Sequence, residues 1–202
     1  MTEDFSNQTI DTILTRRSVR QFQDIPLEDK KIRTILDAAN RAPSAHNQQA
    51  WRFIVIQGQK RRDLSSLVAK YAPEFNKPVS TILRMSARTI ASAPAVIAVM
   101  NTGQFIANGS TLFRVNREDA LDFFRTMEIQ SSAAAVENLL LAANSLGLGS
   151  VWLGILYVIK DQIMDFIDEP SGEFMAVVPI GYPARVPEGP KKKPLDEVIK
   201  YL

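Results

Sequence analysis

The 202-residue chain contains no cysteine and a single histidine, His46. The lack of cysteine excludes disulfides, thiol nucleophiles, iron–sulfur clusters and thiolate zinc sites. One histidine cannot form a histidine-rich metal site, so we expect no metal ligands. The net charge is only +2, which favours neither a nucleic acid nor a membrane surface as partner. Any difficult redox chemistry would therefore depend on a bound cofactor.

Targeting segments and long apolar runs are also missing. Residues Met1 to Phe5 are acidic and polar, unlike a signal peptide, and Asn, Ser, Gly or Pro interrupts each apolar stretch before it reaches membrane-spanning length. The sequence therefore predicts a cytoplasmic protein. Hydrophobic residues make up 46% and charged residues 23% of the chain, which is typical of a folded globular protein. No linker or repeat divides it, so we expect one domain over residues 1–202.

Hydrophobic periodicity and turn residues predict a mixture of helices and strands without regular βαβ alternation, which favours an α+β fold. Helices are expected over Thr9–Thr15, from Pro26 to before Pro43, and over Gln59–Tyr71, Val79–Ala91, Arg117–Leu146 and Ile159–Ile167. Extended segments are expected over Trp51–Gln57, Ala95–Met100, Ser150–Ile155 and Phe174–Ile180.

Two segments lack a clear period. Asn101–Asn116 contains two glycines, and we expect it to form a flexible loop over a pocket. Residues 181–202 contain four prolines and a lysine triplet and have too few apolar residues to fold alone. We expect this segment to form an arm that packs on another surface.

Arginines cluster with a serine in Arg16-Arg17-Ser18-Val19-Arg20. If the segment is extended, Arg16, Ser18 and Arg20 share one face, and two guanidiniums beside a hydroxyl suit a phosphate. The alternative is a solvated cluster after a helix, where cations are favoured. Combined with the polar turn from Pro43 to Trp51, the segment suggests a ligand with an anionic tail and a flat head, such as FMN.

Four motifs, in this order along the chain, resemble the FMN-dependent nitroreductase family. They are Arg16–Arg20; Ala42-Pro43-Ser44 with Asn47, Gln49 and Trp51; Leu146–Gly154; and Ile180–Pro183 with Lys192–Leu195. The resemblance implies a mostly antiparallel central sheet flanked by helices, and a homodimer with two FMN sites at its interface. It also implies that the arm crosses to the partner subunit and extends its sheet.

The resemblance further implies a ping-pong oxidoreductase. NADH or NADPH would reduce FMN, which would then reduce a small-molecule acceptor such as a nitroaromatic or a quinone. No side chain is expected to act as a nucleophile or an acid, so we assign no catalytic residue and regard His46 as a hydrogen-bonded loop residue. Trp51 is expected in the core.

The same resemblance implies residue roles for the cofactor phosphate and its chain. Arg16 and Ser18 would hold the phosphate, Arg17 belongs to the same cofactor-binding segment, and Arg20 would reach the ribityl chain or the pyrimidine edge. Lys192 falls where the family often has a phosphate-binding arginine, although either neighbouring lysine could substitute.

For the flavin ring, the resemblance implies that Pro43, Ser44 and Ala45 pass beside the isoalloxazine. Asn47 and Gln49 would fix the ribityl chain or the loop itself.

A second strand-like segment would complete the ring site. Trp152, Leu153 and Gly154 would lie against the flavin, with the backbone N–H of Leu153 or Gly154 directed at N5. Arg88 would either supply a positive charge near N1 and O2 or be an ordinary surface arginine.

Other interpretations stay open. A reductive dehalogenase or a flavin-consuming enzyme could share the fold, with Phe105, Phe113 and Arg114 lining a pocket for a flat anionic substrate. A flavin-binding regulator or reservoir without turnover would share every cofactor motif, and a structural dimer would bind no cofactor. The sequence does not favour NADH over NADPH.

Overall fold

An antiparallel sheet of four strands forms the centre of the protein, whose computed structural model describes residues 7–113 and 117–202. The strand order is β1-β2-β4-β3, and every neighbouring pair is antiparallel. The strands are β1 (Trp51–Gln57), β2 (Ala95–Asn101), β3 (Gly149–Ser150) and β4 (Glu173–Gly181). With the helices around it, this sheet confirms the predicted α+β class.

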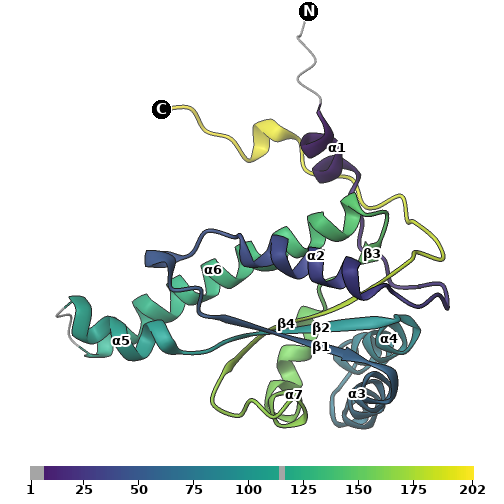
Figure 1. Cartoon of the computed structure of the whole chain (residues 1–202), viewed down its shortest axis with the longest axis horizontal. Helices are drawn as coiled ribbons and strands as arrows, with labels where there is room; N and C mark the ends of the chain where they lie inside the picture. The colour runs from purple at the N-terminus through teal and green to yellow at the C-terminus, as the bar shows by residue number, and fades with distance from the viewer. Residues whose placement is uncertain (1–6, 114–116) are drawn as a thin grey trace, which may run out of the picture.

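Helices cover both faces of the sheet (Figure 1). On one face lie α2 (Asp29–Asn40) and α6 (Arg117–Ser145); on the other lie α3 (Gly58–Tyr71), α4 (Val79–Ser92) and α7 (Lys160–Phe166). The two remaining described α-helices, α1 (Gln8–Thr15) and α5 (Gln104–Phe113), pack on α6. None of the helices in the described part of the chain has the length and apolar composition needed to cross a membrane.

Strand β2 explains why the core has two halves. All seven of its residues are buried, and its side chains alternate between the faces of the sheet. Val96, Ala98 and Met100 join the core under α3 and α4, whereas the intervening residues join the core under α2 and α6. A strand buried on both faces reads as a continuous apolar run, which is how the sequence identified it.

Helix α5 shows that the prediction of a flexible loop over Asn101–Asn116 is wrong for residues 104–113, whereas residues 114–116 lie outside the described residues. The cause is Glu128 on α6, whose carboxylate accepts the N–H groups of Gly103, Phe105 and Ile106 at 2.7 to 3.3 Å. These are donors at the start of α5 that no local side chain satisfies. Gly109 allows α5 to pack closely against α6, because a Cβ at position 109 would come within 2.6 Å of the Phe124 ring.

Two other boundaries differ from the prediction. The extended segment Ser150–Ile155 is wrong beyond Ser150, because pairing with β4 ends after two residue pairs and a 3-10 helix, η3 (Gly154–Ile159), follows. The helix expected from Pro26 begins at Asp29, with Glu28 in the N-cap position.

The buried carboxylate of Glu128, only 1% exposed, should make stability depend on pH. Burial raises the pKa of Glu128 above its ordinary value, although the three N–H bonds oppose the shift. The folded state therefore holds this proton more tightly than the unfolded state, so the Glu128 contribution to stability should fall as pH rises through the raised pKa. Urea unfolding between pH 4 and pH 8 would measure this slope, and Glu128→Gln should remove it.

Glu128→Ala should lower the free energy of unfolding by about 1–3 kcal/mol, because the first N–H groups of α5 lose their acceptor. Asp122→Ala, which also removes a carboxylate from α6 but at an exposed position, serves as a matched control. An unchanged unfolding free energy in Glu128→Ala would contradict the capping role.

Candidate functional site

The Arg16–Arg20 segment runs extended along the outer edge of β3, which is the condition on which the phosphate hypothesis rests. The N–H of Val19 donates to the carbonyl of Ser150 at 3.0 Å, and Ser18 forms a parallel bridge with Ser150. Val19 is buried at 3% exposure while Arg20 is exposed, consistent with side chains that alternate along an extended backbone. The segment is therefore fixed to the sheet.

Gly149 makes this close approach possible. A Cβ at position 149 would lie 2.7 Å from Cβ of Val19, a separation that real side chains do not tolerate. Glycine is needed here because a side chain would collide with Val19, not because the backbone needs a special conformation. It therefore sets the position of the arginine segment.

The three arginines have different surroundings. Arg17 donates from Nε to the carbonyl of Glu188 at 3.0 Å and from Nη1 to the carbonyls of Leu14 and Arg16 at 2.8 Å. Its guanidinium thus ties the start of the arm to the body of the chain. Arg16 lies 3.7 Å from a Glu137 oxygen, and Arg20 makes only a long 3.4 Å bond to the Ser18 carbonyl. Arg16 and Arg20 thus keep more of their donors free than Arg17 does.

The loop after α2 has a strained backbone. His46, Asn47 and Gln49 have φ values of +50°, +54° and +49°, in the left-handed region that non-glycine residues rarely occupy. Such conformations persist where the surrounding structure enforces them, and they often mark functional sites.

Hydrogen bonds hold the strained loop in place. The Ala45 N–H donates to Ser131 Oγ of α6 at 3.1 Å, and the Gln49 N–H donates to Ser44 Oγ at 3.1 Å. The side chains of Asn47 and Gln49 bond to each other at 3.1 Å. These two amides therefore act on the loop itself in the isolated chain.

A hollow of about 330 Å³ lies beside this loop. Its lining residues come from the loop and from one face of α6, and they are Pro43, Ser44, Ala45, Met127, Gln130, Ser131 and Ala134. The loop residues assigned to the flavin ring thus border an open, mostly apolar space.

An aromatic cluster connects the loop with α5 and α6. The His46 ring lies 4.9 Å from the Phe113 ring and 5.9 Å from the Phe105 ring, centroid to centroid. Phe105 is 2% exposed and belongs to the core, so its assignment to a substrate pocket is wrong; Phe113 is 41% exposed. Arg114, the third residue of that assignment, lies outside the described residues.

Trp51 is in the core, as expected. It is 7% exposed, and its Nε1 donates to Asn40 Oδ1 at 2.9 Å. His46 differs from expectation, because within the described residues its imidazole makes ring contacts and no hydrogen bond.

One backbone donor of the Trp152–Gly154 segment is already used within the protein. The Leu153 N–H donates to the Val177 carbonyl at 3.0 Å, so it is already engaged. Among the described residues the Gly154 N–H has no protein acceptor. Trp152 is half-buried against the core on the α2 and α6 side.

The structure does not bring all candidate residues together. Arg88 is exposed on α4 and Lys192 is exposed in the arm. Within the described chain, no hydrogen bond or ion pair joins the arginine segment to the loop from Pro43 to Gln49. Figure 1 shows that loop and α1 toward opposite ends of α6. In one chain, the candidate site is therefore present as two separate halves.

Two α6 residues that sequence reasoning missed connect these halves to the scaffold. Ser131 bonds the loop and Glu137 pairs with Arg16. Their signal in the sequence is faint, because α6 contains many other polar residues and nothing local distinguishes these two.

Known proteins resemble this chain over most of its length. A family model described as "Nitroreductase family" matches residues 13–182. A protein of Archaeoglobus fulgidus, provisionally named an NADH dehydrogenase/NAD(P)H nitroreductase, is 32% identical over 177 residues, which cover 85% of this chain and 83% of that protein. The NADPH-flavin oxidoreductase of Vibrio harveyi is 26% identical and covers 96% of this chain and 73% of its own length.

A solved structure from Desulfovibrio desulfuricans, described provisionally as a nitroreductase in complex with FMN, has a TM-score of 0.73 and 27% identity. It covers 98% of both chains.

Gly149→Ala should displace the arginine segment from β3, because the new methyl group overlaps Val19. We expect the free energy of unfolding to fall by about 1–3 kcal/mol, the usual effect of overpacking. Chemical unfolding would measure this loss. Gly58→Ala, where nothing lies within 4 Å but φ is +57°, is a control for backbone strain alone. Only glycine at position 19 removes the Cβ that lies 2.7 Å away. In a Val19→Gly background, Gly149→Ala should therefore destabilise the protein much less, and an undiminished loss there would contradict the overlap.

Proposed function

We propose that this chain, which belongs to the nitroreductase family, is an FMN-dependent oxidoreductase that uses NADH or NADPH to reduce a small organic acceptor such as a nitroaromatic or a quinone. The observation that carries the proposal is the extended segment fixed to β3, which presents Arg16, Ser18 and Arg20 on a rigid edge. When bound, FMN supplies the electron transfer between nicotinamide and acceptor.

The chemistry of the available groups fits FMN. Arg16 and Arg20 are cations without strong protein partners, and Ser18 adds a hydroxyl, so the three suit a phosphate dianion. Gly154 keeps a backbone N–H for a ring nitrogen. The hollow beside the strained loop is bordered by Pro43 and other loop residues, and a rigid loop positions a flat ring without being reorganised. The protein would bind, orient and shield the cofactor.

We infer that two chains complete each FMN site. The arginine segment and the Pro43–Gln49 loop rest on different parts of α6, so the loop of the partner subunit would face the arginine segment of the first. Helix α1 supports such a dimer, because Ile10, Ile13 and Leu14 are 40%, 47% and 66% exposed. Beside them, α1, α2 and α6 border an open hollow of about 550 Å³. Adjacent apolar residues of this kind are typical of an interface.

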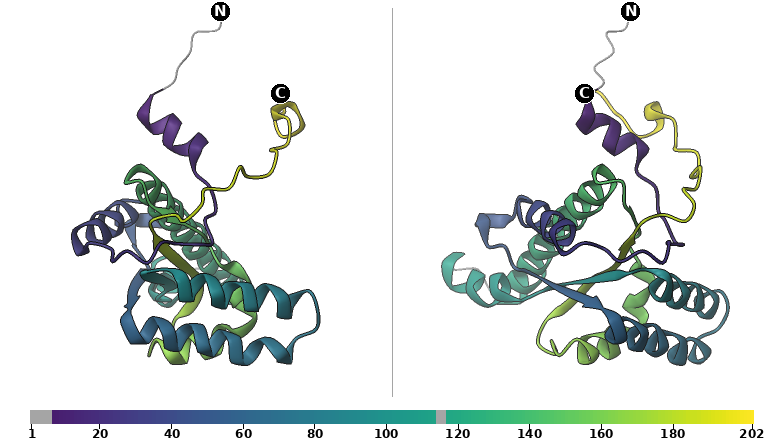
Figure 2. Two further views of the ribbon diagram at one scale, coloured as in Figure 1. Left: turned by 90° about the vertical axis from the view of Figure 1, so that its right-hand side faces the viewer. Right: turned by 45° about the vertical axis from the view of Figure 1, so that its right-hand side comes forward.

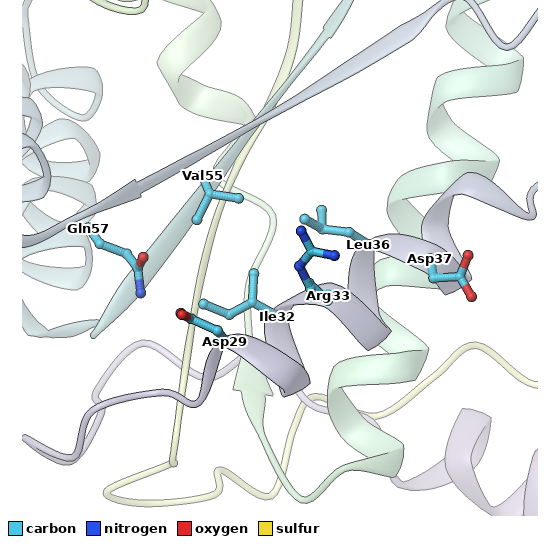
Figure 3. Close-up of a pocket in the computed structure, with 7 residues that line it drawn as sticks. All are labelled: Asp29, Ile32, Arg33, Leu36, Asp37, Val55 and Gln57. Carbon is cyan, nitrogen blue, oxygen red and sulfur yellow. The ribbon is translucent and has the colours of Figure 1, made fainter.

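The residues around β1 support an exchange of arms. The arginine segment already occupies the outer edge of β3, which leaves β1 as the open edge among the described strands. Hollows of about 600 and 390 Å³ flank β1, and Figure 3 shows Ile32 and Val55 projecting into the first of them. An open edge of this kind binds an added strand through its unpaired backbone groups.

The arm carries exposed apolar side chains, which suit packing along such an edge. Leu195 and Val198 are 67% and 63% exposed, and both views in Figure 2 show the arm extending away from the sheet. We propose that residues 1–202 form one domain with an arm, residues 181–202. The arm starts on its own chain, where the Ala184 N–H donates to the Gln21 carbonyl at 3.0 Å, and beyond Pro190 it packs along β1 of the partner subunit. Because Lys192 belongs to this arm, it would also lie against the partner subunit.

The function is tested by anaerobic titration. Protein reconstituted with FMN should lose its visible flavin band when NADH or NADPH is added, and the band should return with a quinone or a nitroaromatic. Flavin that binds but stays oxidised with both nucleotides would contradict the enzyme and indicate a flavin-binding regulator or reservoir.

The matched variants test the phosphate site. Arg16→Ala with Arg20→Ala should weaken FMN binding by about a hundredfold or more, because two charge-assisted hydrogen bonds are lost. Arg62→Ala with Arg84→Ala makes the same change in net charge on exposed positions of α3 and α4 and should bind FMN normally. Equal affinities in the two variants would refute the assignment of the phosphate site.

Truncation tests the arm. A chain ending at Pro190 keeps the contact between Arg17 and Glu188 and removes only the segment assigned to the partner. We expect it to dissociate at concentrations where the intact protein is dimeric and to lose FMN affinity. Sedimentation and flavin fluorescence measure the two effects.

A full-length variant with Gln at positions 191 to 193 separates the two roles. It should keep the dimer and lose only FMN affinity. A truncated chain that remains a dimer with unchanged affinity would show that the arm is not exchanged.

A further inference from the structure

We propose that Glu137 is a positioning residue for FMN, which holds the guanidinium of Arg16 by one edge so that its terminal amino groups face the cofactor phosphate. The inference rests on the proposed function and goes beyond it, because Glu137 itself would not touch the cofactor.

Glu137 contacts only one edge of the Arg16 guanidinium and leaves the other edge open. The recorded contact of 3.7 Å joins Glu137 Oε1 to Nε of Arg16, the nitrogen nearest the aliphatic stem. A guanidinium has two further nitrogens, which carry four of its five donors. In the described part of the chain these two nitrogens form no hydrogen bond or ion pair. Arg16 is thus restrained from one side and open to a ligand on the other.

Arg17 provides the contrast within the same segment. Its guanidinium bonds three backbone carbonyls through Nε and Nη1, so neighbouring arginines in one segment have different tasks. Arg17 fixes the chain, and Arg16 keeps its outer donors free.

Helix α6 fixes the backbone that carries Arg16 as well as its side chain. Asn144 Nδ2 donates to the Thr12 carbonyl at 2.9 Å and to Thr15 Oγ1 at 3.2 Å, which anchors the end of α1 directly before Arg16. Glu137 and Asn144 are two helical turns apart and so lie on the same side of α6. One face of α6 therefore restrains both the main chain and the side chain of Arg16.

This restraint should favour phosphate binding. A free arginine side chain loses much rotamer freedom when it binds an anion, and part of that loss has already occurred where Glu137 holds Nε. A carboxylate near a bound phosphate also repels it. Glu137 is 50% exposed, so water screens this repulsion, whereas the restraint at Nε acts by contact. We expect positioning to be the larger effect.

If positioning dominates, removing Glu137 weakens FMN binding, whereas if repulsion dominates, removing it strengthens FMN binding. Dissociation constants for FMN and for riboflavin distinguish the two effects. Riboflavin has the same ring and ribityl chain but no phosphate. Glu137→Ala in the full-length protein should weaken FMN binding about three- to tenfold, which is the loss expected for one pre-organised ion pair, and should leave riboflavin binding unchanged. Glu137→Gln removes the charge that acts on Arg16 Nε across 3.7 Å, a distance too long for a hydrogen bond, and should weaken FMN binding to a similar extent.

Coupling to Arg16 completes the test. In an Arg16→Ala background, Glu137→Ala should have no further effect on FMN affinity, because its only route to the phosphate has been removed. Thermal unfolding of each variant confirms that it is folded before its affinity is interpreted.

Several outcomes would overturn the inference while leaving the proposed function intact. Tighter FMN binding in both Glu137 variants would mean that repulsion dominates. An equal loss for FMN and riboflavin would indicate a merely structural role, and a loss that persists without Arg16 would exclude the proposed route. Wild-type protein that binds neither flavin would instead refute the proposed function.

Discussion

The backbone hydrogen bond from Val19 to Ser150 is the contact on which the candidate site depends. It fixes the arginine segment to the edge of β3, which is only two residues long and could not by itself hold a long neighbour. The contact requires the bare Cα of Gly149. By occupying one edge of the sheet it also leaves β1 as the edge available to another chain, so the phosphate site and the proposed arm exchange follow from one arrangement.

Helix α6 serves as the common scaffold for the parts around it. Its interior is rich in small residues, and this lets neighbouring backbones approach closely. Several polar side chains of this helix restrain different segments: Glu128 caps α5, Ser131 holds the loop, and Asn144 anchors α1. Asn138 donates to the Ala38 carbonyl at the end of α2 in the same way. A polar residue in this helix is therefore better understood by its partner than by its helix propensity.

The sequence predicted the elements whose signals are local. The buried strand from Ala95 and the small-residue helix up to Leu146 are recognisable because apolar pattern and turn residues lie within them. Helix α5 was missed because its stabilising acceptor, Glu128, is more than twenty residues away in the sequence. The predicted length of β3 was too great because pairing depends on where β4 lies, and the residue types at Trp152 and Leu153 do not reveal where pairing ends.

For the candidate site, local sequence likewise indicated which residues belong to the motifs but not where they lie in space. In the arginine segment, period-two alternation matches the burial only at Val19 and Arg20, which are buried and exposed, because Arg16, Arg17 and Ser18 are all half-buried. The engagement of Leu153 with Val177 was not predictable, nor was the separation of the two halves along α6. Both depend on tertiary packing, which a motif in one segment does not encode.

The loop from His46 to Gln49 also bears on how this protein balances stability against activity. Glycine would adopt the left-handed conformation at positions 46 and 49 with less strain, yet the chain has an imidazole and a carboxamide there. Each such residue typically destabilises the folded state by about 1–3 kcal/mol. The sequence is thus not the most stable one for its own backbone, and the departure is concentrated in one short loop. Proteins commonly accept such a trade-off where side-chain chemistry matters more than folding free energy.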